Sequence, residues 1–147
     1  DFTIIWWSME FNLNIDHLIT IVKFVIPFLL GSLLFFTIII APTIFSTLDA
    51  KNSRSIIRNI FPKLYTWSII LSLINLIVVF SIFSVSLWSS LSFLILILYV
   101  ISRQILMPKI NILSDTNDER RFRKYHSLSV TIFIIQVILL LIVYINV

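Results

Sequence analysis

Four long apolar stretches constrain this chain more than any other feature of its sequence. They cover residues 18–41, 65–84, 87–106 and 127–146, and each is close to the roughly 20 residues that a helix needs to cross a bilayer. The chain has one glycine and four prolines, too few turn formers for a membrane barrel with alternating strands. We therefore expect an all-α membrane protein whose four transmembrane helices form a bundle.

The composition leaves no room for an aqueous domain. Hydrophobic residues make up 59% of the chain and charged residues 12%, and the mean hydropathy is +1.07, whereas charged residues alone reach about a quarter of a soluble domain. We expect an interfacial N-terminal segment at residues 1–17, where Trp6 and Trp7 lie, followed by a single four-helix domain at residues 18–147.

The positive charges predict the orientation. Ten of the 11 lysines and arginines flank or occupy the connections after the first and third spans: Lys51, Arg54, Arg58, Lys63, Arg103, Lys109, Arg120, Arg121, Arg123 and Lys124. Because basic loops stay inside, both termini should face outward and both basic loops the cytoplasm or a mitochondrial matrix. The predicted location is a bacterial inner membrane or an organellar inner membrane, with anionic lipid head groups as partners of the basic loops.

The connections have their own predicted structures. The sequence SVSLWSS at residues 84–90 predicts a tight antiparallel hairpin, and SRSIIRNIF at residues 53–61 predicts a short amphipathic helix on the membrane surface. Pro42 and Pro108 are expected to end the first and third spans, and Pro27 to kink the first. Thr116 and Glu119 have the spacing of a capping box before the last helix.

Polar and small residues mark the expected helix contacts. Gly31 and Ser32 predict a close-approach surface on the first span. Two polar stripes follow helical spacing, one on the second span (Tyr65, Ser68, Ser72, Asn75) and one on the fourth (His126, Ser129, Phe133, Gln136). Asn75 and Gln136 lie at matching depth and could bond to each other. The similar order of prolines, basic loops and stripes raises the hypothesis of two parallel repeats.

Several chemistries lack the residues they need. The chain has no cysteine, and its two histidines, His17 and His126, are predicted at opposite membrane faces, so no metal site is expected. All seven acidic residues lie outside the spans, which leaves no buried carboxylate for acid–base catalysis. The basic loops carry no nucleic-acid module. The sequence therefore predicts no enzyme and no nucleic-acid partner.

Three motifs support a family resemblance. GSLLFFTIIIAPTIF at residues 31–45, FPKLYTWSIIL at 61–71, and LMPKI with FRKYHSLSV between 106 and 130 resemble the uncharacterised membrane-protein family related to transmembrane protein 205. The matching positions are Gly31, Ala41, Pro42, Phe45, Phe61, Pro62, Tyr65, Pro108, Phe122, His126 and Ser129. Ser127 departs from the glycine expected there. The resemblance implies a four-helix integral membrane fold without an assigned reaction.

Three functional hypotheses follow. The first is a non-catalytic accessory or structural subunit that packs against other membrane-protein subunits through its apolar faces. The second is a small transporter or a carrier of a lipophilic ligand that uses the two polar stripes. The third is contact with a haem or a quinone through His126, its neighbour Tyr125 or Arg103, because ionisable residues at membrane depth are functional candidates. No cofactor is otherwise predicted.

Overall fold

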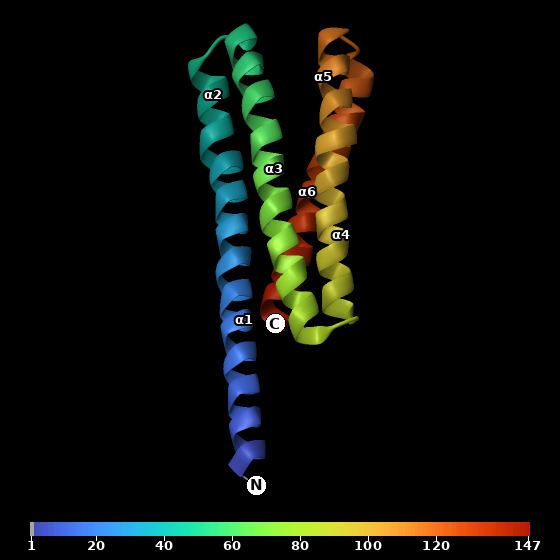
Figure 1. Ribbon diagram of the computed structural model, residues 1–147. Coiled ribbons are helices and arrows are strands. Elements are labelled where there is room, and N and C mark those ends of the chain that lie inside the picture. The colour runs from blue at the N-terminus through green and yellow to red at the C-terminus, as the bar shows by residue number, and fades with distance from the viewer. Residues whose placement is uncertain (1) are drawn as a thin grey trace.

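The computed structural model describes the backbone of residues 2–147 and the side chains of residues 14–147, and in that range it contains helices and no strand. Figure 1 shows them in chain order: α1 (Phe2–Phe35), η1 (Phe36–Ile40), α2 (Ala41–Thr47), α3 (Ala50–Phe83), α4 (Leu87–Ile101), η2 (Ser102–Leu106), α5 (Met107–Asp115) and α6 (Glu119–Asn146).

Four continuous helical segments are long and apolar enough to cross a membrane. They are Asn14–Thr47, Ala50–Phe83, Leu87–Asp115 and Glu119–Asn146. The four-helix membrane fold predicted from the sequence is confirmed. All four segments extend beyond the predicted spans at the end that carries the basic loops, so the bundle includes several helical turns with polar side chains.

Pro42 and Pro108 do not end their spans, which corrects the prediction. Each is the second residue of a helix, α2 or α5, that continues directly from a five-residue π-helix, η1 or η2. Proline lacks an N–H, and its ring pushes on the carbonyl four residues earlier. That carbonyl lies in the π-helix in both cases, and its wider turn relieves the clash without stopping the helix. Likewise, α1 continues through Pro27 and α3 through Pro62.

The combination of a π-helix and a following proline therefore occurs twice. The π-helix begins at Phe36, six residues before Pro42, and at Ser102, six residues before Pro108. In each half, the segment that contains the π-helix and the proline leads through a short turn into one long helix, α3 or α6. This duplication supports the hypothesis of two parallel repeats, because the matching feature is a local backbone geometry and not only a sequence motif.

The predicted surface helix at residues 53–61 does not form a separate element. The segment at residues 53–61 is the beginning of α3, which starts after Asp49, whose carboxylate accepts a hydrogen bond from Asn52 N over 2.7 Å. No glycine interrupts this segment, and a helix that has been nucleated propagates. The backbone of residues 2–13 continues α1 in the same way. The predicted interfacial placement of Trp6 and Trp7 concerns side chains outside the described residues.

Two predicted turns have different outcomes. The hairpin at residues 84–90 is confirmed, with α3 ending at Phe83 and a capping box between Ser86 and Ser89 at the start of α4. The predicted capping box at Thr116 is wrong. Asp118 caps α6 by accepting a hydrogen bond from Arg121 N over 3.1 Å, while Thr116 ends α5, because the chain needs two more residues to reverse direction.

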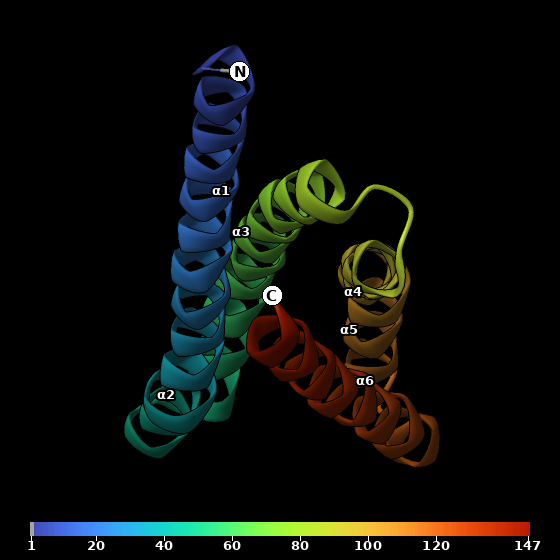
Figure 2. The same cartoon turned by 90° about the horizontal axis from the view of Figure 1, so that it is seen from below.

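The two basic loops lie at the same end of the bundle. In Figure 1 the turns between α2 and α3 and between α5 and α6 are at the top, while the α3–α4 turn and both termini are toward the opposite end. We call these the basic end and the hairpin end. Figure 2 shows α3 between α1 and α4, with α6 crossing the bundle obliquely. Toward the hairpin end the core is apolar and includes Val22, Ile26, Val79, Leu140 and Val143.

Candidate polar site inside the bundle

The two predicted stripes place polar side chains inside the bundle. Ser68, Ser72, Asn75 and Gln136 are each at most 1% exposed. An unpaired polar group costs several kcal/mol in a hydrocarbon environment, so the arrangement of these side chains needs a physical explanation.

The two serines form hydrogen bonds within their own helix, whereas Asn75 forms one to a neighbouring helix. Ser68 and Ser72 donate to carbonyls of their own helix, at Leu64 and Ser68, over 2.9 and 2.7 Å. Asn75 reaches out of α3 and donates from Nδ2 to Ser92 Oγ of α4 over 3.1 Å. The predicted bond between Asn75 and Gln136 is absent among these residues, because α4 lies directly beside α3 and offers a nearer acceptor.

A third stripe, on α4 and the first residue of η2, was missed by the sequence analysis. Ser89, Ser92, Tyr99 and Ser102 are all buried, and their helical spacing of three, seven and three residues is visible in the sequence. Their burial means that the interior is lined with polar groups from three of the four spans. Tyr65 lies beside Ser129 of α6 and near Tyr99 of α4, which connects the three stripes.

Four buried side-chain atoms have no hydrogen-bond partner among the described residues. They are Asn75 Oδ1, Tyr99 Oη, Arg103 Nε and Gln136 Nε2. They come from α3, α4, η2 and α6. A buried donor or acceptor that stays unpaired costs about 1–3 kcal/mol, so four of them represent a substantial loss of stability that packing with apolar side chains would avoid.

Together these residues form what we call the polar column. It consists of Tyr65, Ser68, Ser72, Asn75, Ser92, Tyr99, Arg103, Ser129 and Gln136. Along the helices, Tyr65 and Arg103 lie near the midpoints of the segments Ala50–Phe83 and Leu87–Asp115, and Asn75 with Ser92 lies closer to the hairpin end. Beyond Asn75 and Gln136 the buried residues are apolar apart from Ser89. The column thus runs from the middle of the bundle toward the hairpin end and stops at an apolar plug.

His126 and Tyr125 lie outside the polar column. His126 is exposed and stacks on Phe122, with ring centroids 5.8 Å apart. Tyr125 faces Lys109, whose Nζ lies 6.0 Å from the ring centroid. His17 is exposed on α1, far along the chain toward the N-terminus. Among residues with described side chains, no group of three or more His, Cys, Asp or Glu could hold a metal ion.

Gly31 does not have the predicted packing role within one chain. It is exposed, and a Cβ atom built there would meet nothing within 4 Å. Ser32 bonds to the carbonyl of Phe28 in its own helix over 2.8 Å. The contact between α1 and α3 instead includes aromatic side chains, because Phe28 packs edge-on against Trp67, with centroids 5.8 Å apart.

Comparison with known proteins places the chain among uncharacterised sequences. Residues 24–119 match a family model described as a domain of unknown function, DUF4149. An uncharacterized protein of Aquifex aeolicus (strain VF5) is 35% identical over 107 residues, which cover 73% of this chain and 79% of that protein. No solved structure matches the chain. The matched segment contains the α3, α4 and η2 residues of the polar column and ends before Ser129 and Gln136.

Proposed function

Because this chain belongs to the DUF4149 family of domains of unknown function, we propose its function from its own interior: it is a non-catalytic membrane protein that binds a small polar or amphipathic ligand in the polar column. The four unpartnered polar atoms of the column carry this proposal. A transporter and a carrier for a lipophilic ligand with a polar head would both use such a site.

The chemistry of the four atoms defines the ligand class. Arg103 Nε and Gln136 Nε2 are donors, Asn75 Oδ1 is an acceptor, and the Tyr99 hydroxyl can be either. A ligand with oxygen acceptors and at least one hydroxyl or amine would satisfy them together. The apolar plug on the hairpin side favours entry from the opposite side, and Arg103, in the part of the column nearer the basic end, would attract an anionic or carbonyl-bearing group.

Native mass spectrometry of the gently purified protein tests this proposal. We expect the wild type to carry a bound small molecule, and Asn75→Leu and Gln136→Leu to lose it while still inserting. Asn146→Leu and Gln104→Leu are matched controls, because both residues are exposed, and they should keep the ligand. A wild type without any bound molecule, or equal retention in all four variants, would contradict the proposal.

A specific observation also favours the accessory-subunit hypothesis as a second candidate. Gly31, the one glycine of the sequence, lies on the exposed side of α1, where Phe24, Phe28 and Phe35 are each about half exposed or more. Small residues let membrane helices approach closely, so this notch between aromatic side chains suits another subunit's helix. Migration of the gently solubilised protein as a lone monomer would remove this candidate.

The proposal also covers the membrane in which the protein lies, its orientation, its family relation and a contact with a cofactor. The positive-inside rule supports a bacterial or organellar inner membrane with the basic end on the cytoplasmic or matrix side. The relation to the transmembrane protein 205 family rests on the motifs quoted above. A haem or quinone contact is less well supported for His126, which lies outside the polar column, than for Arg103, which lies in it.

A further inference from the structure

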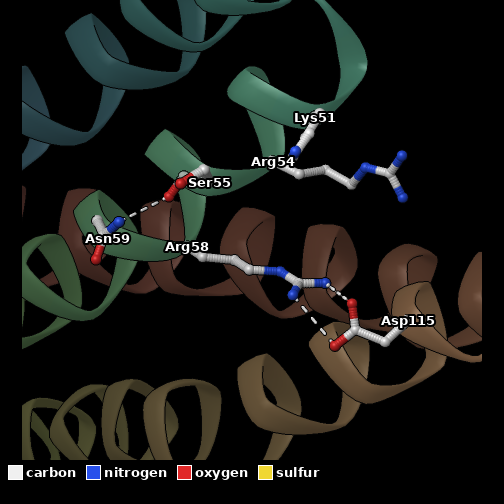
Figure 3. A pocket seen from close by; sticks show the side chains of 6 residues that line it. All are labelled: Lys51, Arg54, Ser55, Arg58, Asn59 and Asp115. Atoms are coloured by element: carbon white, nitrogen blue, oxygen red, sulfur yellow. Dashed lines mark hydrogen bonds and ion pairs between the residues drawn. The ribbon is translucent and has the colours of Figure 1, made fainter.

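A charged pocket lies at the basic end, separate from the polar column. It has a volume of about 380 Å³ and lies between the first turns of α3 and the last turn of α5. Figure 3 shows the six residues that line it: Lys51, Arg54, Ser55, Arg58, Asn59 and Asp115. Three of them are cations and one is an acid, so the pocket has a formal charge of +2 (three minus one).

The acid of this pocket is already paired. Arg58 of α3 makes a two-point ion pair with Asp115 of α5, with N–O distances of 2.6 and 3.1 Å, and also donates to the carbonyl of Asn111 over 3.2 Å. These three bonds hold Arg58 across the gap between the two halves of the chain. The pair forms one wall of the pocket, and Asp115 is already occupied by Arg58.

Lys51 and Arg54 supply the charge that is available to a ligand. Arg54 uses only Nε within the protein, donating to the carbonyl of Ala50 over 2.9 Å, and neither cation forms an ion pair with a described acidic residue. Figure 3 shows that Arg54 and Arg58 extend from α3 in the same direction. The guanidinium group of Arg54 and the ammonium group of Lys51 beside one opening supply the positive charge and the hydrogen-bond donors that a phosphate needs.

We propose that this pocket binds the phosphate head group of an anionic membrane lipid. Exposed apolar side chains lie close to the lining residues along the chain: Ile56 follows Ser55 directly, Ile112 is 58% exposed one turn before Asp115, and Leu48 lies in the turn before α3. A soluble phosphate would not use these side chains, whereas acyl chains would pack against them. The bound lipid would join α3 of the first half to α5 of the second.

The test compares lipids on delipidated protein in detergent by native mass spectrometry. We expect phosphatidylglycerol to bind at least tenfold more tightly than phosphatidylcholine. Lys51→Gln and Arg54→Gln should each weaken phosphatidylglycerol binding about fivefold, since each interfacial cation contributes on the order of 1 kcal/mol. Arg123→Gln is the matched control, an exposed arginine of α6 outside the pocket, and should change binding less than twofold.

Three results would overturn the proposal. An equal loss in Arg123→Gln would show diffuse attraction by the whole basic end. Displacement of phosphatidylglycerol by equimolar inorganic phosphate would show a site for a soluble anion. Equal binding of the two lipids would show no head-group recognition. Arg54→Lys, which keeps the charge, should retain most of the binding and separates a binding defect from misfolding. The pocket shares no residue with the polar column, so either site can fail alone.

Discussion

Asn75 of α3 and Ser92 of α4 are joined side chain to side chain, with 3.1 Å between Nδ2 and Oγ, and both are buried. Lipid gives neighbouring helices no hydrophobic drive to associate, so a bond of this kind helps to fix how two spans align. The bond leaves Asn75 Oδ1 without a partner among the described residues. The same side chain therefore has a structural contact and a free acceptor inside the column.

Removing the Ser92 hydroxyl should destabilise the bundle. Ser92→Ala leaves the Asn75 amide unpaired, and we expect a loss of about 1 kcal/mol in the free energy of unfolding. Ser90→Ala is the control, because Ser90 is exposed and bonds only to the Ser86 carbonyl of its own turn. Reversible unfolding in mixed micelles measures both. Equal effects of the two substitutions would show that the interhelical bond contributes nothing.

Replacing Gln136 should have the opposite effect. Gln136→Leu removes a buried donor that has no partner among residues 14–147, so the ligand-free protein should become more stable by about 1 kcal/mol. Gln104→Leu, at an exposed position, should change stability by less than about 0.5 kcal/mol. If Gln136→Leu instead lowers the unfolding free energy, its amide has a partner within the folded chain, and the column is a structural network.

The ion pair between Arg58 and Asp115 should contribute little on its own. Their side chains are 33% and 59% exposed, and solvent screens exposed pairs to about 0.2–1 kcal/mol. A double-mutant cycle with Arg58→Gln and Asp115→Asn should show a coupling in this range that decreases with added salt. The same cycle on Arg121 and Asp118, which are 3.5 Å apart with the arginine 73% exposed, should give a smaller value.

A large side chain at Gly31 should leave the fold intact. Nothing lies within 4 Å of the Cβ position, and leucine is a better helix former than glycine by nearly 1 kcal/mol. Gly31→Leu should therefore not lower stability, but it should abolish co-migration with a partner that packs into the notch. Ser81→Leu, on an exposed face of α3, is the control. If Gly31→Leu still co-migrates with a partner subunit, that subunit binds to a surface other than the one around Gly31.

Hydrophobic length and charge were sufficient to predict the number of spans and the common end of the two basic loops. The burial of Asn75 and Gln136 also followed from helical spacing, because polar side chains in a span avoid lipid. The bonding partner of Asn75 did not follow. Spacing shows which side chains share a face, but the choice between Ser92 and Gln136 depends on which helices are neighbours and how they cross.

Local backbone effects explain the remaining errors. Pro42 and Pro108 were expected to stop their helices, but a preceding π-helix accommodates each of them, and a proline in a helical sequence does not by itself predict a π-helix. Gly31 was expected to pack within the chain because small residues mark close contacts. The sequence shows that such a surface exists, but it cannot show whether its partner belongs to the same chain or to another one.

Site-directed labelling of the two turns at the basic end tests the account most directly. The chain has no cysteine, so single substitutions at exposed positions report unambiguously: Asn52→Cys and Thr116→Cys at the basic end, and Val85→Cys at the hairpin end. A membrane-impermeant thiol reagent should label Asn52→Cys and Thr116→Cys from one side of sealed vesicles and Val85→Cys from the other. Labelling of Asn52→Cys and Thr116→Cys from opposite sides would contradict the arrangement on which the polar column and the lipid pocket depend.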